Sequence, residues 1–530
     1  MARNNNLNKE MKKLIFCISI TLLFMACGTT KTVVKETPIK PAKTVTDFAN
    51  TITAAELKEA LYTYASDEFQ GRETGELGQK MAVEYLKKHY VALGIPSPLA
   101  EGDYFQEVPL VKTGAPIISF RINDQEFKAV DDFVSIAEGE NGLITTDEIV
   151  YAGYGIETES FSSYDSIDVK DKIVLLKGGE PKKDSIYTLS GTTTASQWST
   201  RQQYGVKRDV AMAKGAKAIL FYDSQIYPFV AKNMGSGGGL SLKDDKKGGD
   251  MHYFFVNTSL AKGINASIDT DTKARIIKAP LSLDYKKNTT DVSSENVVAF
   301  IKGSEKPDEI IVISAHLDHE GIKDGKIYNG ADDDGSGTIG VLEIAEAFKL
   351  AADNGQTPKR SILFLHVTGE EKGLLGSRYY TDINPIFPLK NTVVNLNIDM
   401  IGRSDPKRKS KTKNYVYLIG SDKLSTELHN MSEEVNKNCC NIELDYTFND
   451  ENDPNRFYYR SDHYNFAKNN IPVIFYFNGT HDDYHQHTDT PDKIEYDLLE
   501  NRARLVFNTA WELANRDDRI IVDKPTATDE

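Results

Sequence analysis

The chain has 530 residues, which is more than one hydrophobic core usually spans, since cores rarely grow past about 250–300 residues. Its apolar content of 40% and aromatic content of 10% are those of an ordinary globular protein. The net charge of −15 argues against nucleic acid as the main partner, because phosphate binding requires a basic face.

The first predicted element is an export signal. Residues 14–26 are almost wholly apolar and follow a basic segment that opens at Met11-Lys12-Lys13. This run is too short to cross a bilayer comfortably as a helix, but it suits the core of a signal peptide. It ends in F-M-A-C-G, which resembles a bacterial lipobox and implies a lipid anchor at Cys27. The alternative is a plain secretory signal with an incidental cysteine.

Residues 28–52 are rich in Thr, Lys and Pro and predict a flexible tether. Helical patterns follow at 54–65 and 78–93, and the second ends at Gly94. Short β-like runs then dominate from about 136 to 291, with a helix near 202–214. Residues 232–250 contain GSGGG without the Gly-Lys-Ser/Thr of a phosphate-binding loop, so we interpret them as a flexible loop.

From residue 295 the pattern alternates between strand and helix. Strands are predicted at NVVAFIKG, EIIVISAHL, RSILFLHVTG, TVVNLNIDMIG, NYVYLIGS and PVIFYFNG. The helices between and after them include GTIGVLEIAEAFKLAA, LSTELHNMSEEVNKN and the C-terminal YDLLENRARLVFNTAWELANRDD. This alternation predicts an α/β fold with a central mixed, mostly parallel sheet flanked by helices.

Two adjacent cysteines, Cys439 and Cys440, remain once the signal is removed. Neighbouring cysteines can form a disulfide only in a strained ring, and no C-x-x-C spacing indicates a zinc site. We therefore expect free thiols here.

Charged and imidazole side chains follow the predicted strands. In sheets of this kind, binding sites collect where the strands end. His316 ends one strand, Glu370 and Glu371 follow a second, and Asp399 follows a third. His485 and His487 lie in the loop after the last strand, and Asp332, Asp333 and Asp334 stand in GADDDGSG at the start of a helix. We expect these groups to converge.

The converging groups predict a metal centre. Imidazole and carboxylate ligands without thiolate suit zinc, and also cobalt or manganese. Five ligands exceed the need of one tetrahedral ion, so we expect two ions that share a bridging carboxylate. Asp332 and Asp334 would then cap the helix or orient the loop.

Two further carboxylates have predicted roles in this centre. Asp318 lies two residues after His316 and is placed to accept the other N–H of that imidazole. Glu370 adjoins the ligand Glu371 and can take a proton from an attacking water and pass it to a leaving amine. Together these groups predict metal-assisted hydrolysis.

These motifs resemble those of the co-catalytic di-zinc aminopeptidases, metallopeptidase family twenty-eight. The shared pattern is H-x-D, G-A-D-D-x-x-S-G, E-E-x-G-L-x-G-S, D-M and H-x-x-x-D-T, in this order, and it is found here at residues 316–318, 330–337, 370–377, 399–400 and 485–490. The resemblance implies that one metal takes His316, Asp333 and Asp399, and the other takes Asp333, Glu371 and His485. It also implies that Glu370 is the general base, that Asp318 orients His316, and that Tyr484 stabilises the oxyanion.

The same resemblance implies a cis peptide bond at Asp333-Asp334 and a pocket-shaping role for Ser461-Asp462-His463. The chain departs from the pattern at His487, where relatives often carry proline; we expect this histidine to line the rim.

The region 136–291 resembles a protease-associated domain. The expected organisation is a lipoprotein signal peptide at 1–27, a tether at 28–52, a discontinuous domain of zinc-exopeptidase fold at 53–135 and 292–517, and the inserted domain at 136–291.

We expect most of all an exported, lipid-anchored aminopeptidase. It would bind two zinc ions per chain and act on peptides. We expect it in the cell envelope, in the outer membrane facing the periplasm or the cell surface, with no obligate protein partner. A carboxypeptidase or dipeptidase on the same scaffold stays open, as do a glutaminyl cyclase and an inert receptor-like relative. No G-x-S-x-G or H-E-x-x-H motif is present to indicate serine or single-zinc protease chemistry.

Overall fold

The computed structural model describes residues 43–137, 139–235, 237–243 and 251–524. The predicted signal peptide, the anchor at Cys27 and most of the predicted tether lie outside these residues. The last part of the predicted tether is not extended: Val45–Ala49 form helix α1, capped by Thr44, and Phe48 and Ile52 are buried. Two large apolar side chains drive this segment onto the core, which corrects the prediction of a tether that runs to residue 52.

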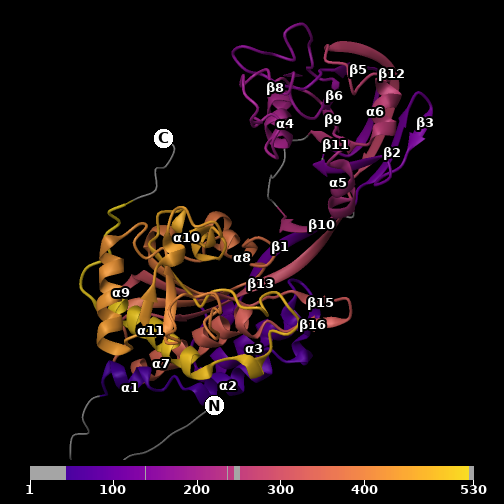
Figure 1. Cartoon of the computed structure of the whole chain (residues 1–530). Helices are drawn as coiled ribbons and strands as arrows, with labels where there is room; N and C mark the ends of the chain where they lie inside the picture. Colours follow the sequence, from indigo (N-terminus) through magenta and orange to yellow (C-terminus); the bar gives the residue numbers. More distant parts are fainter. Residues whose placement is uncertain (1–42, 138, 236, 244–250, 525–530) are drawn as a thin grey trace, which may run out of the picture. The chain divides into compact units, whose positions relative to one another are not determined.

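A nine-stranded mixed sheet is formed mainly by strands from the C-terminal half of the chain (Figure 1). Its four central strands, in the order β17-β14-β18-β21, pair in parallel, and the strands outside them pair mostly antiparallel. Parallel pairing is thus concentrated at the centre, whereas the sequence predicted a mostly parallel sheet. The strands are, in spatial order, β10 (Gly237–Leu242), β1 (Phe105–Gly114), β13 (Thr289–Ile301), β17 (Arg360–Val367), β14 (Lys306–His316), β18 (Thr392–Ile398), β21 (Val473–Phe477), β19 (Tyr415–Ile419) and β20 (Glu443–Asp445).

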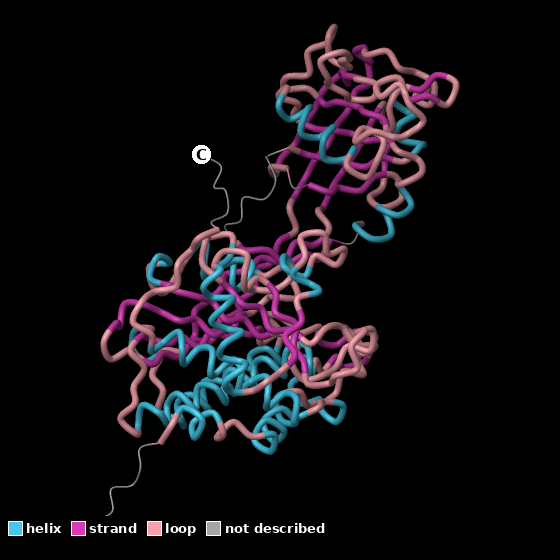
Figure 2. The backbone as a smooth tube through the Cα atoms, turned by 60° about the vertical axis from the view of Figure 1, so that its left-hand side comes forward, coloured by secondary structure: helices cyan, strands magenta, loops and turns pink. Residues whose placement is uncertain are grey.

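Helices cover both faces of this sheet (Figures 1 and 2). One layer joins α1, α2 (Ala54–Tyr64), α3 (Leu77–Leu93), α7 (Gly337–Asp353) and α11 (Tyr496–Asn515), which contact one another. The other face carries α8 (Leu375–Arg378) and α10 (His463–Ala467), while α9 (Thr426–Cys439) packs on α11. In α7 the residues at helical spacing, such as Ile339, Ile344 and Phe348, are fully buried, as the sequence pattern predicted.

A second, eight-stranded sheet is built from residues between 117 and 286, so its strands begin ahead of the predicted boundary at 136. The domain boundaries themselves stay predictions. The strands β5, β6, β9 and β11 pair in parallel, and the others pair antiparallel. In spatial order the strands are β3 (Gln125–Phe127), β2 (Ile117–Ile122), β12 (Arg275–Lys286), β5 (Gly142–Tyr151), β6 (Ile173–Lys177), β9 (Ala218–Tyr222), β11 (His252–Val256) and β4 (Phe133–Ala137); the associated helices are α4 (Gln203–Ala213), α5 (Tyr227–Met234) and α6 (Thr258–Ile264).

The glycine-rich segment is not wholly a loop. Gly237–Leu242 form β10, which pairs antiparallel with β1, and α5 takes up the start of the predicted loop. Backbone pairing needs no side-chain alternation, so the sequence pattern gave no sign of this strand. Two small hairpins, β7 (Lys182–Lys183) with β8 (Ile186–Tyr187) and β15 (Gly321–Lys323) with β16 (Lys326–Tyr328), complete the described strands.

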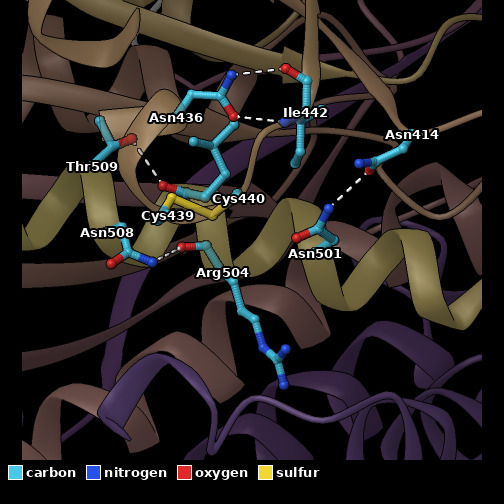
Figure 3. The surroundings of a disulfide bond; sticks show 10 residues. Asn414, Asn436, Cys439, Cys440, Ile442, Asn501, Arg504, Asn508 and Thr509 are labelled. Atoms are coloured by element: carbon cyan, nitrogen blue, oxygen red, sulfur yellow. Dashed lines mark hydrogen bonds between the residues drawn. A yellow bond between two sulfur atoms is a disulfide. The ribbon is translucent and has the colours of Figure 1, made fainter. Parts of the chain in front are cut away.

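Cys439 and Cys440 form a disulfide at the end of α9, so the prediction of free thiols is wrong (Figure 3). Asn436 fixes the turn that follows: its amide donates to the Ile442 carbonyl at 2.8 Å and accepts the Ile442 N–H at 2.9 Å. Whether two neighbouring cysteines form a disulfide depends on the local backbone geometry, and their spacing in the sequence does not reveal that geometry. Among the described helices, none combines the length and the apolar character needed to cross a membrane.

Candidate metal centre

The carboxyl ends of the four central parallel strands meet at one edge of the nine-stranded sheet. His316 ends β14, Asp399 follows β18, and Glu371 lies in a turn four residues after the end of β17. His485 lies in the loop after β21. The strands themselves are buried on both faces, which fixes their ends rigidly and brings side chains far apart in sequence to one place.

Asp333 lies at the centre of the cluster. Its Oδ1 is 3.2 Å from His316 Nε2, and its Oδ2 is 3.1 Å from His485 Nε2. On the first side His316 Nε2 is also 3.6 Å from Asp399 Oδ1. On the second side His485 Nε2 is 3.2 Å from Glu371 Oε2. The structure therefore brings all five predicted ligands together, with the two oxygens of Asp333 facing different partners.

The turn that carries Asp333 is held by its neighbours. Gly330 precedes it with φ +53°, and a side chain there would collide with the Asp333 carbonyl and the His319 ring. The Asp333-Asp334 peptide bond is cis, as the family resemblance implied. Asp334 accepts the N–H of Gly337, at the start of α7, at 2.9 Å and that of His316 at 3.2 Å, so it both caps the helix and orients the loop.

Asp332 faces away from the five ligands. It accepts hydrogen bonds from the Gly402 N–H at 2.7 Å and the Ser336 hydroxyl at 3.0 Å, and His481 Nε2 lies 3.0 Å from it. Asp489 completes this support, because its Oδ2 accepts the backbone N–H groups of Asp332 at 2.9 Å and Asp333 at 3.2 Å.

The predicted contact between Asp318 and His316 differs in its atoms. The backbone carbonyl of Asp318, 3.0 Å from His316 Nδ1, is the partner, whereas the carboxylate is 4.0 Å away. The carboxylate instead accepts the Thr74 hydroxyl at 2.7 Å and the Glu370 N–H at 3.2 Å. A backbone oxygen thus holds the imidazole, and the carboxylate ties the segment after β17 to the turn before α3.

The donor set fits a divalent cation. His316 Nε2, Asp333 Oδ2 and Glu371 Oε1 are buried and have no hydrogen-bond partner among the described residues, and such orphaned groups are costly. Three clusters of potential ligand atoms occur among the described residues, and together they include all five predicted ligands. They also include Asp334, whose oxygens are already taken by backbone N–H groups, and two residues outside the prediction, His319 and Glu320.

The electrostatics of the cluster show what a cation would relieve. Burial raises the pKa of Glu370 well above its ordinary value, and the Glu371 and Asp399 carboxylates add to this. Burial and the Asp333 charge raise the pKa of Glu371 to about 8. Burial alone would raise the pKa of Asp333, but the neighbouring imidazoles of His316 and His485 hold it well below its usual range. Several carboxyl groups here can be ionised together only if positive charge lies beside them.

A pocket lies beside the five ligands. Glu370 lines it next to Asp333 and Asp399, and Tyr484 reaches it with its ring stacked on His485. Arg460 donates to the Tyr484 hydroxyl at 3.3 Å. Apolar side chains form the rest of the wall: Met400, Phe457, Phe475 and Phe477.

The predicted pocket motif, Ser461-Asp462-His463, includes a residue that hydrogen-bonds to the predicted metal ligand Asp399. The Ser461 hydroxyl donates to Asp399 Oδ2 at 2.6 Å, and Asp462 accepts the Ser377 hydroxyl at 2.5 Å. His463 is buried and stacks on Phe475. His487, by contrast, packs against Tyr328 and belongs to none of the metal-capable clusters found among the described residues.

Sequence reasoning missed three buried residues of this site. His319 Nδ1 lies 2.7 Å from Glu371 Oε1, and His481 and Asp489 hold the turn with Asp332. His319 stands only three residues after His316, but a histidine in a loop carries no periodic signal. Asp489 lies in the H-x-x-x-D-T pattern that was matched, so the motif itself could have pointed to it.

A centre of imidazole and carboxylate ligands at the carboxyl edge of a mixed α/β sheet is the kind found in hydrolytic metalloenzymes. Residues 296–510 match the model of "Peptidase family M28". Over 204 residues it is 29% identical to "Aminopeptidase YwaD" of Bacillus subtilis (strain 168), covering 38% of each chain. It is 28% identical to a "Probable zinc metalloprotease" of Pyricularia oryzae, covering 42% of this chain and 50% of that protein.

The chain therefore spans half or less of the length of these two curated relatives. Among solved structures, it is similar to "Aminopeptidase from Aneurinibacillus sp. strain AM-1", with 18% identity and a TM-score of 0.49, covering 91% of this chain and 98% of that one.

Proposed function

We propose that the protein is a zinc-dependent aminopeptidase that removes N-terminal residues from peptides. The observation that carries the proposal is the convergence of five side chains on Asp333, with its two oxygens 3.2 Å from His316 Nε2 and 3.1 Å from His485 Nε2. The M28 match over residues 296–510 and the names of the similar proteins support the same proposal.

In this proposal His316, Asp333 and Asp399 hold one zinc ion, and Asp333, Glu371 and His485 hold a second. When bound, zinc would act as a Lewis acid that polarises the substrate carbonyl and makes water a stronger nucleophile at neutral pH. Ser461 keeps Asp399 oriented through its 2.6 Å hydrogen bond, and the carbonyl of Asp318 fixes the tautomer of His316.

Glu370 is the proposed general base. It lines the pocket beside Asp333 and Asp399, so it can take a proton from the attacking water and deliver it to the amine that leaves. Tyr484 lines the same pocket and is the proposed donor to the oxygen that becomes negative, with Arg460 holding its hydroxyl in place.

A carboxypeptidase is the second candidate, and Arg460 is the observation that favours it. Its guanidinium lines the pocket and would pair with the terminal carboxylate of a peptide. Peptides with free and with acetylated N-termini separate the two functions. We expect the purified, zinc-loaded protein to cleave the free-amine peptides and to leave the acetylated ones intact. Equal cleavage of acetylated peptides would overturn the aminopeptidase assignment in favour of the carboxypeptidase.

We also propose that the protein is exported, anchored by a lipid on Cys27, and held in the cell envelope. The apolar run 14–26 and the F-M-A-C-G sequence support this. Labelling with a palmitate analogue should mark the wild-type protein and not Cys27→Ala. Residues 136–291 are the proposed protease-associated domain, which the separate eight-stranded sheet supports.

A further inference from the structure

A second cleft, of about 570 Å³, lies at the carboxyl ends of β6 and β9 in the eight-stranded sheet. These neighbouring strands are parallel, and the carboxyl ends of parallel strands are where ligands commonly bind. The volume falls within the usual range of ligand pockets. None of the metal-capable clusters among the described residues lies here, so the cleft calls for a different ligand chemistry.

Lys177 lines the cleft and Lys207 lies beneath it, and both ammonium groups already have partners. Lys207 is fully buried, and its ammonium donates to the carbonyls of Gly179 at 2.6 Å and Lys177 at 3.2 Å. Lys177 in turn donates to the carbonyl of Ile268 at 3.2 Å. Both ammonium groups therefore hold backbone loops in place, and they are poorly available to an anion.

Some of the acceptors that line the cleft have unfilled positions. Glu180 is 3% exposed; its Oε1 accepts the Ser196 hydroxyl at 2.8 Å, but its Oε2 has no hydrogen-bond partner among the residues that the structure describes. The Ser199 hydroxyl is likewise buried without a partner there. Asp223 Oδ1 accepts the Gln225 N–H at 3.0 Å, whereas its Oδ2 receives only a long hydrogen bond, 3.5 Å, from the Tyr204 hydroxyl. A ligand that brings several N–H donors and a positive charge would satisfy these oxygens.

Four tyrosines also line the cleft, Tyr154, Tyr187, Tyr204 and Tyr222, together with Lys182 and Asp269. Their faces already attract cations: Lys182 Nζ is 4.0 Å from the centre of the Tyr187 ring, and Lys177 Nζ is 4.6 Å from that of Tyr154. We propose that this cleft binds the basic side chain of a peptide, an ammonium or guanidinium group, through Glu180 and Asp223. A cleft of this size is much larger than one side chain, so it admits flanking backbone as well.

The test uses the full chain and the blocked peptide acetyl-Gly-Arg-Gly-amide, which has no free amine for an aminopeptidase to act on. The Gln and Glu versions of this peptide are the controls. Trp198 is one of two tryptophans and lies beside Ser196 and Ser199, so its fluorescence reports on the cleft, and calorimetry gives the affinity. We expect binding of the Arg peptide and at least about tenfold weaker binding of both control peptides.

Two variants test the residues. Glu180→Gln and Asp223→Asn should each weaken binding of the Arg peptide by at least about tenfold, whereas Asp165→Asn, an exposed acid of the same region, should not change it. If Glu180→Gln fails to fold, Asp223→Asn decides the question, because Asn keeps the oxygen that accepts the Gln225 N–H.

Equal binding of the Gln peptide, tighter binding of the Glu peptide, or unchanged binding by both variants would overturn the proposal. Turnover of an unblocked chromogenic substrate is measured in parallel and should be the same in both variants as in the wild type. The outcome is therefore separate from that of the proposed aminopeptidase activity.

Discussion

At the carboxyl ends of its strands, each of the two large sheets holds buried charged residues, and the fold satisfies some of them and leaves others open. In the nine-stranded sheet, buried His316, Asp333 and Glu371 have ligand atoms without a hydrogen-bond partner among the residues that the structure describes. At the carboxyl ends of the eight-stranded sheet, buried Lys207 is satisfied by backbone carbonyls. Buried charge that the fold itself satisfies indicates a structural role, whereas buried charge left open indicates a missing ligand.

Substitution of Asp333, the proposed ligand of both zinc ions, should have the largest effect on activity. We expect Asp333→Asn to lose most bound zinc and essentially all peptidase activity, because the two oxygens of Asp333 face ligands on both sides. Elemental analysis after dialysis and a peptide cleavage assay measure the two losses. The matched control is Asp353→Asn, a 58%-exposed acid on α7, which should change neither. If Asp333→Asn kept its full zinc content, the comparison would fail, because the unpartnered carboxylate oxygens would then not indicate a metal site.

A change beside the ligands should separate metal binding from catalysis. Glu370→Gln should keep bound zinc and the melting temperature but lower kcat by about 10²–10⁴-fold, the usual contribution of a general base. Elemental analysis and steady-state kinetics on the same preparation measure both. Turnover close to that of the wild type would rule out Glu370 as the base, even with the metal centre intact.

The satisfied lysine should matter for stability and not for catalysis. Lys207→Met should lower the free energy of unfolding by about 1–3 kcal/mol, because the carbonyls of Lys177 and Gly179 lose their buried donor. Thermal and urea unfolding measure the change, and peptidase kinetics should stay as in the wild type. Lys214→Met, which removes a partly exposed lysine paired with Glu157, should have a smaller effect on unfolding. An equal effect of the two substitutions would remove the distinction between satisfied and surface charge.

The smallest effect concerns Glu343 on α7, in the helical layer. Burial, with Glu346 and Glu56 nearby, raises its pKa to about 8. The folded protein therefore binds more protons than the unfolded chain between about pH 4.5 and 8, so this group's contribution falls as pH rises through that window. Glu343→Gln should raise the melting temperature by a few degrees at pH 8.5 and have less effect at pH 5. The exposed Glu512→Gln on α11 should show no such pH dependence, and a pH-independent effect of Glu343→Gln would contradict the assignment.

The parts that the sequence predicted well are those that a periodic apolar pattern specifies. The strand runs before His316, Asp399 and His485 were visible as largely apolar stretches, so the groups that follow them could be assigned to one edge. The long helix α7 was equally clear from its apolar spacing.

The rest depends on tertiary contacts. Helix α1 is too short for a periodic signal, and it forms because Phe48 and Ile52 are buried by the rest of the fold. The glycine strand β10 has no alternating side chains. The partner of His316 was predicted at the right residue but the wrong atom, because the path of a loop decides whether a carbonyl or a carboxylate faces the ring.

The loop after β21 supports the metal centre in two ways. His485 is one of the predicted ligands, and Asp489, four residues later, accepts a hydrogen bond from the backbone N–H of Asp333. A shift of this segment would displace His485, a proposed ligand of the second zinc ion. It would also loosen the backbone that holds Asp333, the proposed ligand of both ions. Affinities at the two positions should consequently rise and fall together, and efforts to retune one of them alone through this loop will disturb the other.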